Sequence, residues 1–367
     1  MHALEIIRGE ERIDALAGKE FAILRREANL EAAVVDGLLT ATLQLDDLRV
    51  GDRLEFAYSM KTRIPLLGSH AEFVASGALP ATADQFYLRG SWPTATGMQI
   101  RTTDDWAAQD IRRQGDRSSF ELLRDGLEPV LVPENAPLRF HHVRQIEGTD
   151  YRAWGDVAAV FAPLYAEASV LAADSPLRAE IERIRSANPD QSGQVLAALR
   201  LVQDEVRYLA LAMGEGGLVP ATADQTWSRR LGDCKAKTAL LMAVLKELGV
   251  AARPVLVSSF DDALDQRLPT ASAFDHVMVQ AEVDGQTVWL DGTRVNDRSL
   301  VALPPLDYGW VLPVEETGAT LVQMPRQPPG RPRRLVRPER DHLLGLSDCG
   351  PRRNRHRDAE HGHAAQQ

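Results

Sequence analysis

The hydrophobic pattern of the chain changes at Tyr151, and this change constrains the fold more than any other feature. Between about residues 20 and 146, short segments of alternating polar and apolar residues are separated by turn residues such as Asp36-Gly37. This alternation predicts strands with one packed and one solvated face, as in an antiparallel β-sandwich. The predicted strands span 38–45, 53–60, 85–92 and 138–146. We therefore assign 1–150 to an N-terminal β-sandwich domain.

After Tyr151 the apolar residues recur three and four positions apart, which predicts helices. The predicted helices span 154–172, 176–186, 192–213 and 234–248. Gly249 directly follows the last of them and is typical of a helix C-terminus. Further strands are predicted at 254–258, 274–283 and 286–291. A chain of 367 residues has room for two domains, so 151–324 is predicted to be a separate α+β domain.

Beyond Met324 the composition shifts to Pro, Arg and His, which predicts a disordered tail over 325–367.

The formal net charge of -10 argues against a nucleic-acid partner. No apolar segment is long enough for a membrane span. The first residues carry no secretory signal, which favours a cytoplasmic location for the sequence as written. Only Cys234 and Cys349 are present, and Cys349 lies in the predicted tail, so we expect no disulfide framework.

The turn Gly232-Asp233-Cys234-Lys235 opens directly into the apolar helix 234–248. A thiol at a helix N-terminus lies at the positive end of the helix dipole, and Lys235 adds a positive charge beside it. Both features stabilise the reactive thiolate. A lone cysteine is more often a small buried side chain, so the neighbouring elements have to decide between these two interpretations.

The second part of the pattern is a predicted hairpin whose loop is Asp284-Gly285. A two-residue loop there places His276 opposite Thr293 and makes Asp291 a diagonal neighbour of His276. Such neighbours are close enough for a carboxylate to reach an imidazole. A one-residue bulge would move Asp291 to the other face of the hairpin.

Taken singly, His276 and Asp291 each have an ordinary structural interpretation, as a strand histidine and a turn residue. Together with Cys234 they occur in the order Cys, His, Asp on a helix start and two adjacent strands, which is an arrangement for thiol attack on a carbonyl. We therefore predict Cys234 as nucleophile, His276 as base and Asp291 as the residue that orients the histidine. A metal site is the weaker alternative, because one Cys and one His fall short of four zinc ligands. No cofactor is expected.

Three stretches of 151–324 resemble the bacterial transglutaminase-like superfamily, which has a papain-like fold: RLGDCKAKTALLMAVLKELGVAARPVLVSS, FDHVMVQAEVDGQTVWLDGT and VRYLALAMGEGGLVP. The resemblance implies a cysteine-bearing helix packed on an antiparallel sheet that supplies His276 and Asp291. The stretch LEAAVVDGLLTATLQLDDLRVGDRLEFAYSM is similar to a β-sandwich domain of unknown function that precedes such cores in bacterial proteins. Relatives are commonly exported, which favours a periplasmic or secreted location if residues are missing upstream.

The sequence departs from these relatives just after the motif cysteine. They commonly carry an acidic residue where this chain has Ala236-Lys237, a change that we expect to affect only helix-surface charge. An oxyanion hole is expected to use the backbone N–H of Cys234 and a second donor. Tyr208, Gln225 and Trp227 are the candidates, although Tyr208 is predicted on an apolar helix face and Trp227 in the core.

The leading functional hypothesis is acyl transfer from a peptide or protein amide to Cys234. With water as acceptor the enzyme is a protease or amidase, and with an amine it is a transglutaminase that crosslinks. The sequence does not choose between these acceptors. The alternative is a non-catalytic scaffold in which the same fold docks a peptide or protein, because fold alone does not determine function.

Overall fold

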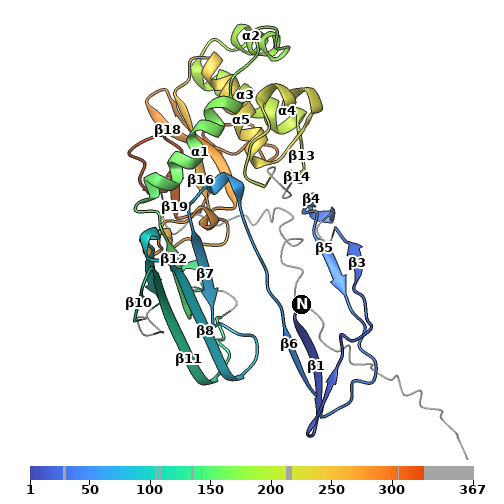
Figure 1. Cartoon of the computed structure of the whole chain (residues 1–367). Helices are drawn as coiled ribbons and strands as arrows, with labels where there is room; N and C mark the ends of the chain where they lie inside the picture. Colours follow the sequence, from blue (N-terminus) through green and yellow to red (C-terminus); the bar gives the residue numbers. More distant parts are fainter. Residues whose placement is uncertain are drawn as a thin grey trace, which may run out of the picture.

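The protein combines helices with mostly antiparallel sheets, a mixed α+β fold, as described by a computed structural model (Figure 1). Figure 1 shows the helices gathered around one sheet at one end of the molecule. The structure describes residues 1–325 except 28–29, 104–105, 107–109, 134–135, 142, 212–216 and 305. Cys349 and all but the first residue of the predicted tail therefore lie outside the described residues.

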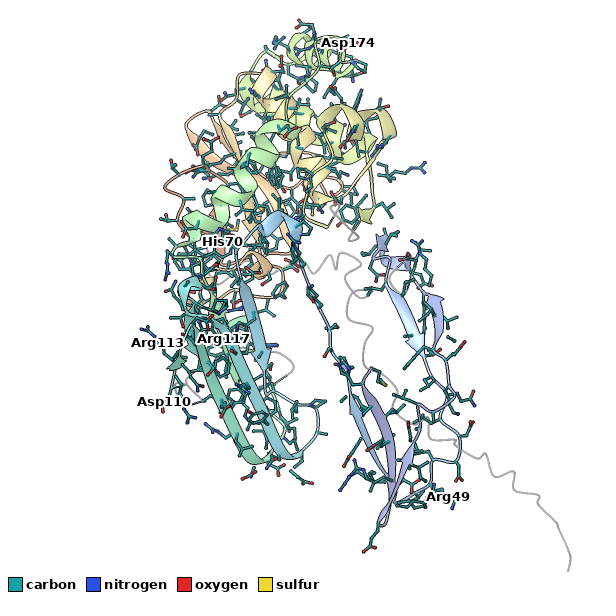
Figure 2. The ribbon with its side chains drawn as sticks, viewed as in Figure 1. Arg49, His70, Asp110, Arg113, Arg117 and Asp174 are labelled. Atoms are coloured by element: carbon teal, nitrogen blue, oxygen red, sulfur yellow. The ribbon has the colours of Figure 1, made fainter. Side chains whose placement is uncertain are left out.

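The first 57 residues form small sheets with little buried surface. Their strands are β1 (Ala3–Arg8), β2 (Glu11–Asp14), β3 (Ala22–Arg25), β4 (Val34–Val35), β5 (Leu39–Thr42) and β6 (Arg53–Ala57). The three-stranded sheet has the order β2-β1-β6, and β3 pairs with β5. Leu4, Ile6 and Ala15 form a small core, whereas every residue of β3 and β5 is exposed. In Figure 1 these dark blue strands lie apart from β7 to β12, and Figure 2 shows Arg49 near their far tip.

The next strands form two three-stranded antiparallel sheets that pack on each other. They are β7 (Glu72–Ser76), β8 (Ala83–Pro93), β9 (Gln99–Thr102), β10 (Arg112–Gln114), β11 (Arg117–Leu127) and β12 (Gln145–Thr149). The orders are β10-β11-β8 and β7-β12-β9. One hydrophobic cluster joins the sheets, with the rings of Phe73 and Phe120 6.2 Å apart. His70, labelled in Figure 2, lies where these sheets meet the helical half, and its Nδ1 is 2.9 Å from Asp150 Oδ1.

The predicted strand 138–146 is wrong over most of its length. Leu138–Phe140 form a 3-10 turn after Pro137, and the strand begins only at Gln145. Pro137 fixes its own φ near -60° and donates no hydrogen bond, which suits a turn rather than a strand interior. Alternation of polar and apolar residues did not reveal this local restriction.

The second half is built on a five-stranded antiparallel sheet of order β18-β17-β16-β19-β20. These strands are β16 (Ala252–Val257), β17 (His276–Val283), β18 (Gln286–Leu290), β19 (Trp310–Pro313) and β20 (Val322–Gln323). The helices are α1 (Trp154–Ala168), α2 (Leu177–Ala187), α3 (Gln191–Glu205), α4 (Ala223–Arg229) and α5 (Cys234–Glu247). The pattern analysis did not predict the short helix α4.

The predicted helix 192–213 is too long at its C-terminal end. Helix α3 stops at Glu205, and Val206 already has an extended backbone. The next residues form β13 (Arg207–Tyr208), which pairs in parallel with β15 (Leu231–Gly232), and β14 (Ala210–Leu211), which pairs with β4. Val206 and Tyr208 are of the β-branched and aromatic types that favour an extended backbone. Pairing with β15 supplies the hydrogen bonds for this backbone.

Helix α5 is the buried centre of the second half, as predicted. It begins at Cys234, and its N-cap Asp233 accepts a hydrogen bond from the Ala236 N–H at 2.9 Å. Leu240 and Leu241 are fully buried against α3 and β17. Each such side chain contributes roughly 1.5–3 kcal/mol of hydrophobic stabilisation. The helix ends before Gly249, whose positive φ of 78° is typical of a glycine C-terminal stop.

The hairpin β17–β18 has the predicted register. Asp284 and Gly285 form its loop, with φ of 51° and 77°, and Val283 pairs with Gln286. Positive φ at both loop positions matches a type I′ turn, whose twist suits a two-residue hairpin. Strand β18 ends at Leu290, which pairs with Val279. Asp291 follows directly, at the end of the hairpin where β17 begins.

Candidate active site

Cys234 lies in the first turn of α5 and is 8% exposed. Its thiol is free and packs beside the cluster formed by α1, β16 and β19. Lys235 does not add an unpaired charge next to it, because its Nζ is bonded to Asp233 Oδ2. The expectation that Lys235 favours the thiolate is therefore corrected: Asp233 offsets that positive charge. The helix N-terminus remains the local source of positive potential.

His276 and Asp291 are in direct contact. His276 Nε2 lies 3.0 Å from Asp291 Oδ2. The second carboxylate oxygen, Oδ1, accepts hydrogen bonds from the Thr293 N–H at 2.8 Å and from Thr293 Oγ1 at 2.6 Å. Asp291 is only 4% exposed, so these contacts fix its orientation and thereby that of the imidazole.

The electrostatics of this pair favour its charged form. Burial by itself lowers the pKa of His276, but the charge of Asp291, its hydrogen bond and the nearby Cys234 together raise that pKa well above its ordinary value. Burial raises the pKa of Asp291, yet the charge and hydrogen bond of His276 and the bonds from Thr293 bring it below its usual range. The site therefore stabilises an imidazolium next to a carboxylate.

The thiol of Cys234 and the ring of His276 meet in one pocket. Both side chains line this pocket, and the neighbouring Cys234 contributes to the raised pKa of His276. Because Nε2 contacts Asp291, Nδ1 is the ring nitrogen that is left to face the sulfur. The pocket holds about 80 Å³ and its walls are mainly apolar. The wall residues include Phe161, Tyr165, Leu218, Leu256, Ala271 and Phe274.

Of the three candidates for a second oxyanion donor, Tyr208 is near enough to the thiol for Cys234 to affect its pKa. It lies on β13 and is 38% exposed, not on a helix face as expected. Burial and the charges of Cys234, Asp233, Asp291 and Asp275 raise its pKa, which places the phenol within electrostatic reach of the site.

The other two candidates have structural roles. The side chain of Gln225 completes a capping box with Thr222 at the start of α4. Trp227 is buried in the core, with the guanidinium of Arg230 3.3 Å from its ring centroid.

The burial of two polar side chains around the site was not predicted from the sequence. Tyr165 of α1 lines the pocket, and burial together with the charges of Cys234 and Asp233 raises its pKa well above the ordinary value. Lys237 is 2% exposed, and its Nζ donates to the Val206 carbonyl at 2.6 Å. Its position three residues after Cys234 on a buried helix was the available signal.

The expectation that Ala236-Lys237 affects only helix-surface charge is wrong, because both residues are buried. Burial lowers the pKa of Lys237 to about 8, against the raising effect of the charges of Asp291 and Asp204. The departure from the relatives therefore lies inside the core, next to the orienting carboxylate. Among the described residues no group of three or more His, Cys, Asp or Glu side chains converges to hold a metal ion.

Comparisons with known proteins agree with this architecture. Residues 1–131 match DUF3857, a domain of unknown function with a solved structure. No curated protein matches the chain. The solved structure of a "putative protease" from Parabacteroides distasonis aligns with a TM-score of 0.63 at 10% identity, covering 88% of this chain and 61% of that one. The chain therefore spans about three-fifths of the length of that protein.

Two further solved structures align more loosely. A "putative cysteine protease" from Cytophaga hutchinsonii has a TM-score of 0.26 at 13% identity, and the alignment covers 62% of this chain and 72% of that one. A structure described as a "TGase" has a TM-score of 0.25 at 12% identity, with coverages of 55% and 46%.

The fold and the site define a class: the chain is an α+β protein with a transglutaminase-like fold, in which a cysteine-bearing helix packs on an antiparallel sheet that supplies a histidine. Its first 131 residues carry the DUF3857 match. Among the residues that the structure describes, none of the helices has the length and apolar character that crossing a bilayer requires.

Proposed function

We propose that this protein transfers or hydrolyses the acyl group of a peptide or protein amide, with Cys234 as nucleophile. The observation that carries the proposal is the contact of Asp291 with His276, whose ring lines the same pocket as the thiol of Cys234. Asp291 orients the imidazole and keeps it charged, so that the thiol proton can be held on His276. The three residues retain the roles assigned from the sequence.

In the first half of the reaction the Cys234 sulfur forms a bond to the amide carbonyl carbon. The carbon–nitrogen bond then breaks, and His276 gives its proton to the leaving amine. A thioester remains on Cys234. The first N–H groups of a helix have no partner inside the helix, so the Cys234 N–H at the start of α5 is available to stabilise the oxyanion.

In the second half, water or an amine attacks the thioester and gives its proton to His276. The sulfur–carbon bond breaks and the thiol is restored. Water as acceptor gives a protease or amidase, which we favour, and a primary amine as acceptor gives a transglutaminase. The pocket beside the thiol is small and apolar, which favours an acyl donor with an apolar side chain near the reacting amide.

The proposal is tested with casein peptides as acyl donors and dansylcadaverine as amine acceptor. Mass spectrometry counts new peptide termini, deamidated glutamines and dansylated glutamines for the wild type, Cys234→Ser and Lys246→Gln. Lys246 is an exposed residue of α5 far along the helix from the thiol, so its variant serves as the matched control.

We expect new termini with the wild type and Lys246→Gln, and none with Cys234→Ser. Dansylated peptides in place of new termini would assign the amine as acceptor. Peptide binding without any of these products, unchanged in Cys234→Ser, would contradict the proposal and favour a docking scaffold.

A further inference from the structure

One wall of the thiol pocket belongs to the segment between β16 and β17, which leads directly into His276. It contains two 3-10 turns, η6 (Leu264–Gln266) and η7 (Ala271–Ala273). Ala271 and Phe274 of this segment line the pocket. An irregular segment has no strand ladder to hold it, so its position depends on contacts from other elements.

Glu72 of β7 holds the second of these turns from outside. Its Oε2 accepts a hydrogen bond from the Ala271 N–H at 2.7 Å, and its Oε1 accepts one from the Ser272 N–H at 2.9 Å. The first N–H groups of a helical turn have no partner within it, and a carboxylate satisfies them as an N-cap side chain does. Here the capping carboxylate comes from a strand about 200 residues earlier in the chain.

Glu147 of β12 holds the preceding residues of the same segment. It is 1% exposed, accepts a hydrogen bond from the Leu268 N–H at 3.1 Å and forms an ion pair with Arg267. Arg267 also donates to Asp261 Oδ2 at 2.6 Å, and Asp261 is fully buried. Buried charges are costly unless they are paired. Removing any one member of this network would leave its partner as an uncompensated buried charge.

The two carboxylates come from one face of one sheet. In the β7–β12 ladder Glu72 is opposite Thr149, and Glu147 lies two residues before Thr149 on the same side. Glu72 and Glu147 are therefore diagonal neighbours that reach the segment together. The described contacts thus connect a sheet of the first half to the wall of a pocket in the second half.

We propose that Glu72 and Glu147 are positioning residues that set the apolar wall of the thiol pocket, and that the sheet β7-β12-β9 thereby takes part in selecting the acyl donor. This inference rests on the proposed function, since it assigns the pocket to the acyl donor. Losing Glu72 leaves Cys234, His276 and Asp291 in place but releases Ala271 and Phe274 from their fixed distance to the thiol.

The test compares two alkylating reagents on Cys234 in a Cys349→Ser background. Iodoacetamide is small and polar, whereas iodoacetanilide carries an apolar ring that the wall would contact. Rates are measured for the wild type, Glu72→Gln, Glu72→Ala and Glu121→Gln, each relative to a free cysteine peptide. Glu121 lies on β11 of the same half and faces Arg89 on the surface, so its variant is the matched control.

We expect Glu72→Ala to lower the ratio of iodoacetanilide to iodoacetamide rates by about fivefold, the scale of one typical net hydrogen bond, while the iodoacetamide rate changes less than twofold. Glu72→Gln keeps the side-chain shape and should give a smaller shift in the same direction, which covers the case that Glu72→Ala does not fold. Hydrogen exchange at 264–274 should become faster in both.

An unchanged ratio in folded Glu72 variants, or a parallel fall of both rates, overturns the inference. Failure of the proposed function is a separate outcome, because it would show as wild-type iodoacetamide rates that do not depend on His276. In that case the ratio still reports whether Glu72 sets the wall.

Discussion

His276 Nε2 lies 3.0 Å from Asp291 Oδ2, across two strands that the loop Asp284-Gly285 joins. The contact follows from the length of that loop, because a two-residue turn brings the start of β17 next to the end of β18. The register therefore decides the electrostatics of the site.

The first prediction concerns the proton of His276. Burial is the largest single effect and lowers the pKa of His276, but the charge and hydrogen bond of Asp291, together with Cys234, raise it well above its ordinary value. Asp291→Asn should therefore lower the pKa of His276 relative to the wild type. A titration of the histidine ring signals by NMR measures both values, with His276→Gln to assign the signal. An equal pKa in the two proteins would contradict the assigned role of Asp291.

The raised pKa of His276 also has a consequence for stability. The folded protein holds this proton above the unfolded pKa of 6.5, so the contribution is fully present below that pH and is lost as the pH rises through the folded value. Urea unfolding of the wild type and Asp291→Asn from pH 6 upward should show a difference that shrinks with rising pH. A constant difference would argue against a proton-linked contact.

Lys237 should give the opposite slope. Its pKa is lowered to about 8 in the folded protein from 10.5, so between these values the unfolded chain binds the extra proton and stability rises with pH. One proton corresponds to a slope of about 1.4 kcal/mol per pH unit. The free energy of unfolding of the wild type minus that of Lys237→Met should therefore increase from pH 8 to pH 10. A flat difference would mean that folding does not lower the pKa of Lys237.

Tyr208 and Gln225 provide a contrast between a site residue and a cap. Tyr208→Phe removes a hydroxyl near the thiol and should lower kcat by about tenfold or more with little change in stability. Gln225→Ala breaks the capping box at the start of α4 and should cost about 1 kcal/mol of stability without changing kcat. Kinetics and urea unfolding of both variants separate the two roles. A loss of kcat in Gln225→Ala with a loss of stability alone in Tyr208→Phe would contradict these roles.

Gly232 should not tolerate a side chain. A Cβ at this position would lie 2.9 Å from the Ala236 Cβ and 3.0 Å from the Thr226 Cγ2, both of which are buried. Gly232→Ala should therefore destabilise the protein by about 1–3 kcal/mol through overpacking beside the first turn of α5. Urea unfolding measures this loss. A neutral substitution would show that β15 and α4 can move apart.

Local chemistry in the sequence was enough to predict the elements that carry the site. The glycine after α5, the turn Gly232-Asp233 before it and the loop Asp284-Gly285 each specify local backbone geometry, so the helix start and the hairpin register followed from them. The contact between His276 and Asp291 was predictable for the same reason. The α+β class followed from the change of periodicity at Tyr151.

Features that depend on tertiary contacts were not predictable in this way. The end of α3 at Glu205 is decided by the pairing of β13 with β15, which lies more than twenty residues further along the chain. The burial of Lys237 and the capping of η7 by Glu72 depend on elements that no local pattern joins. The partner of Lys235 was missed because a salt bridge two residues back along the chain looks like an ordinary surface charge pair.

The most direct test of the account is the rate of iodoacetamide labelling at Cys234 near pH 6, compared between the wild type and His276→Ala in a Cys349→Ser background. Ordinary thiols react slowly at this pH, whereas a thiolate paired with an imidazolium does not. The account predicts that the wild type is labelled at least about tenfold faster than His276→Ala. Equal and slow labelling of the two proteins would contradict it.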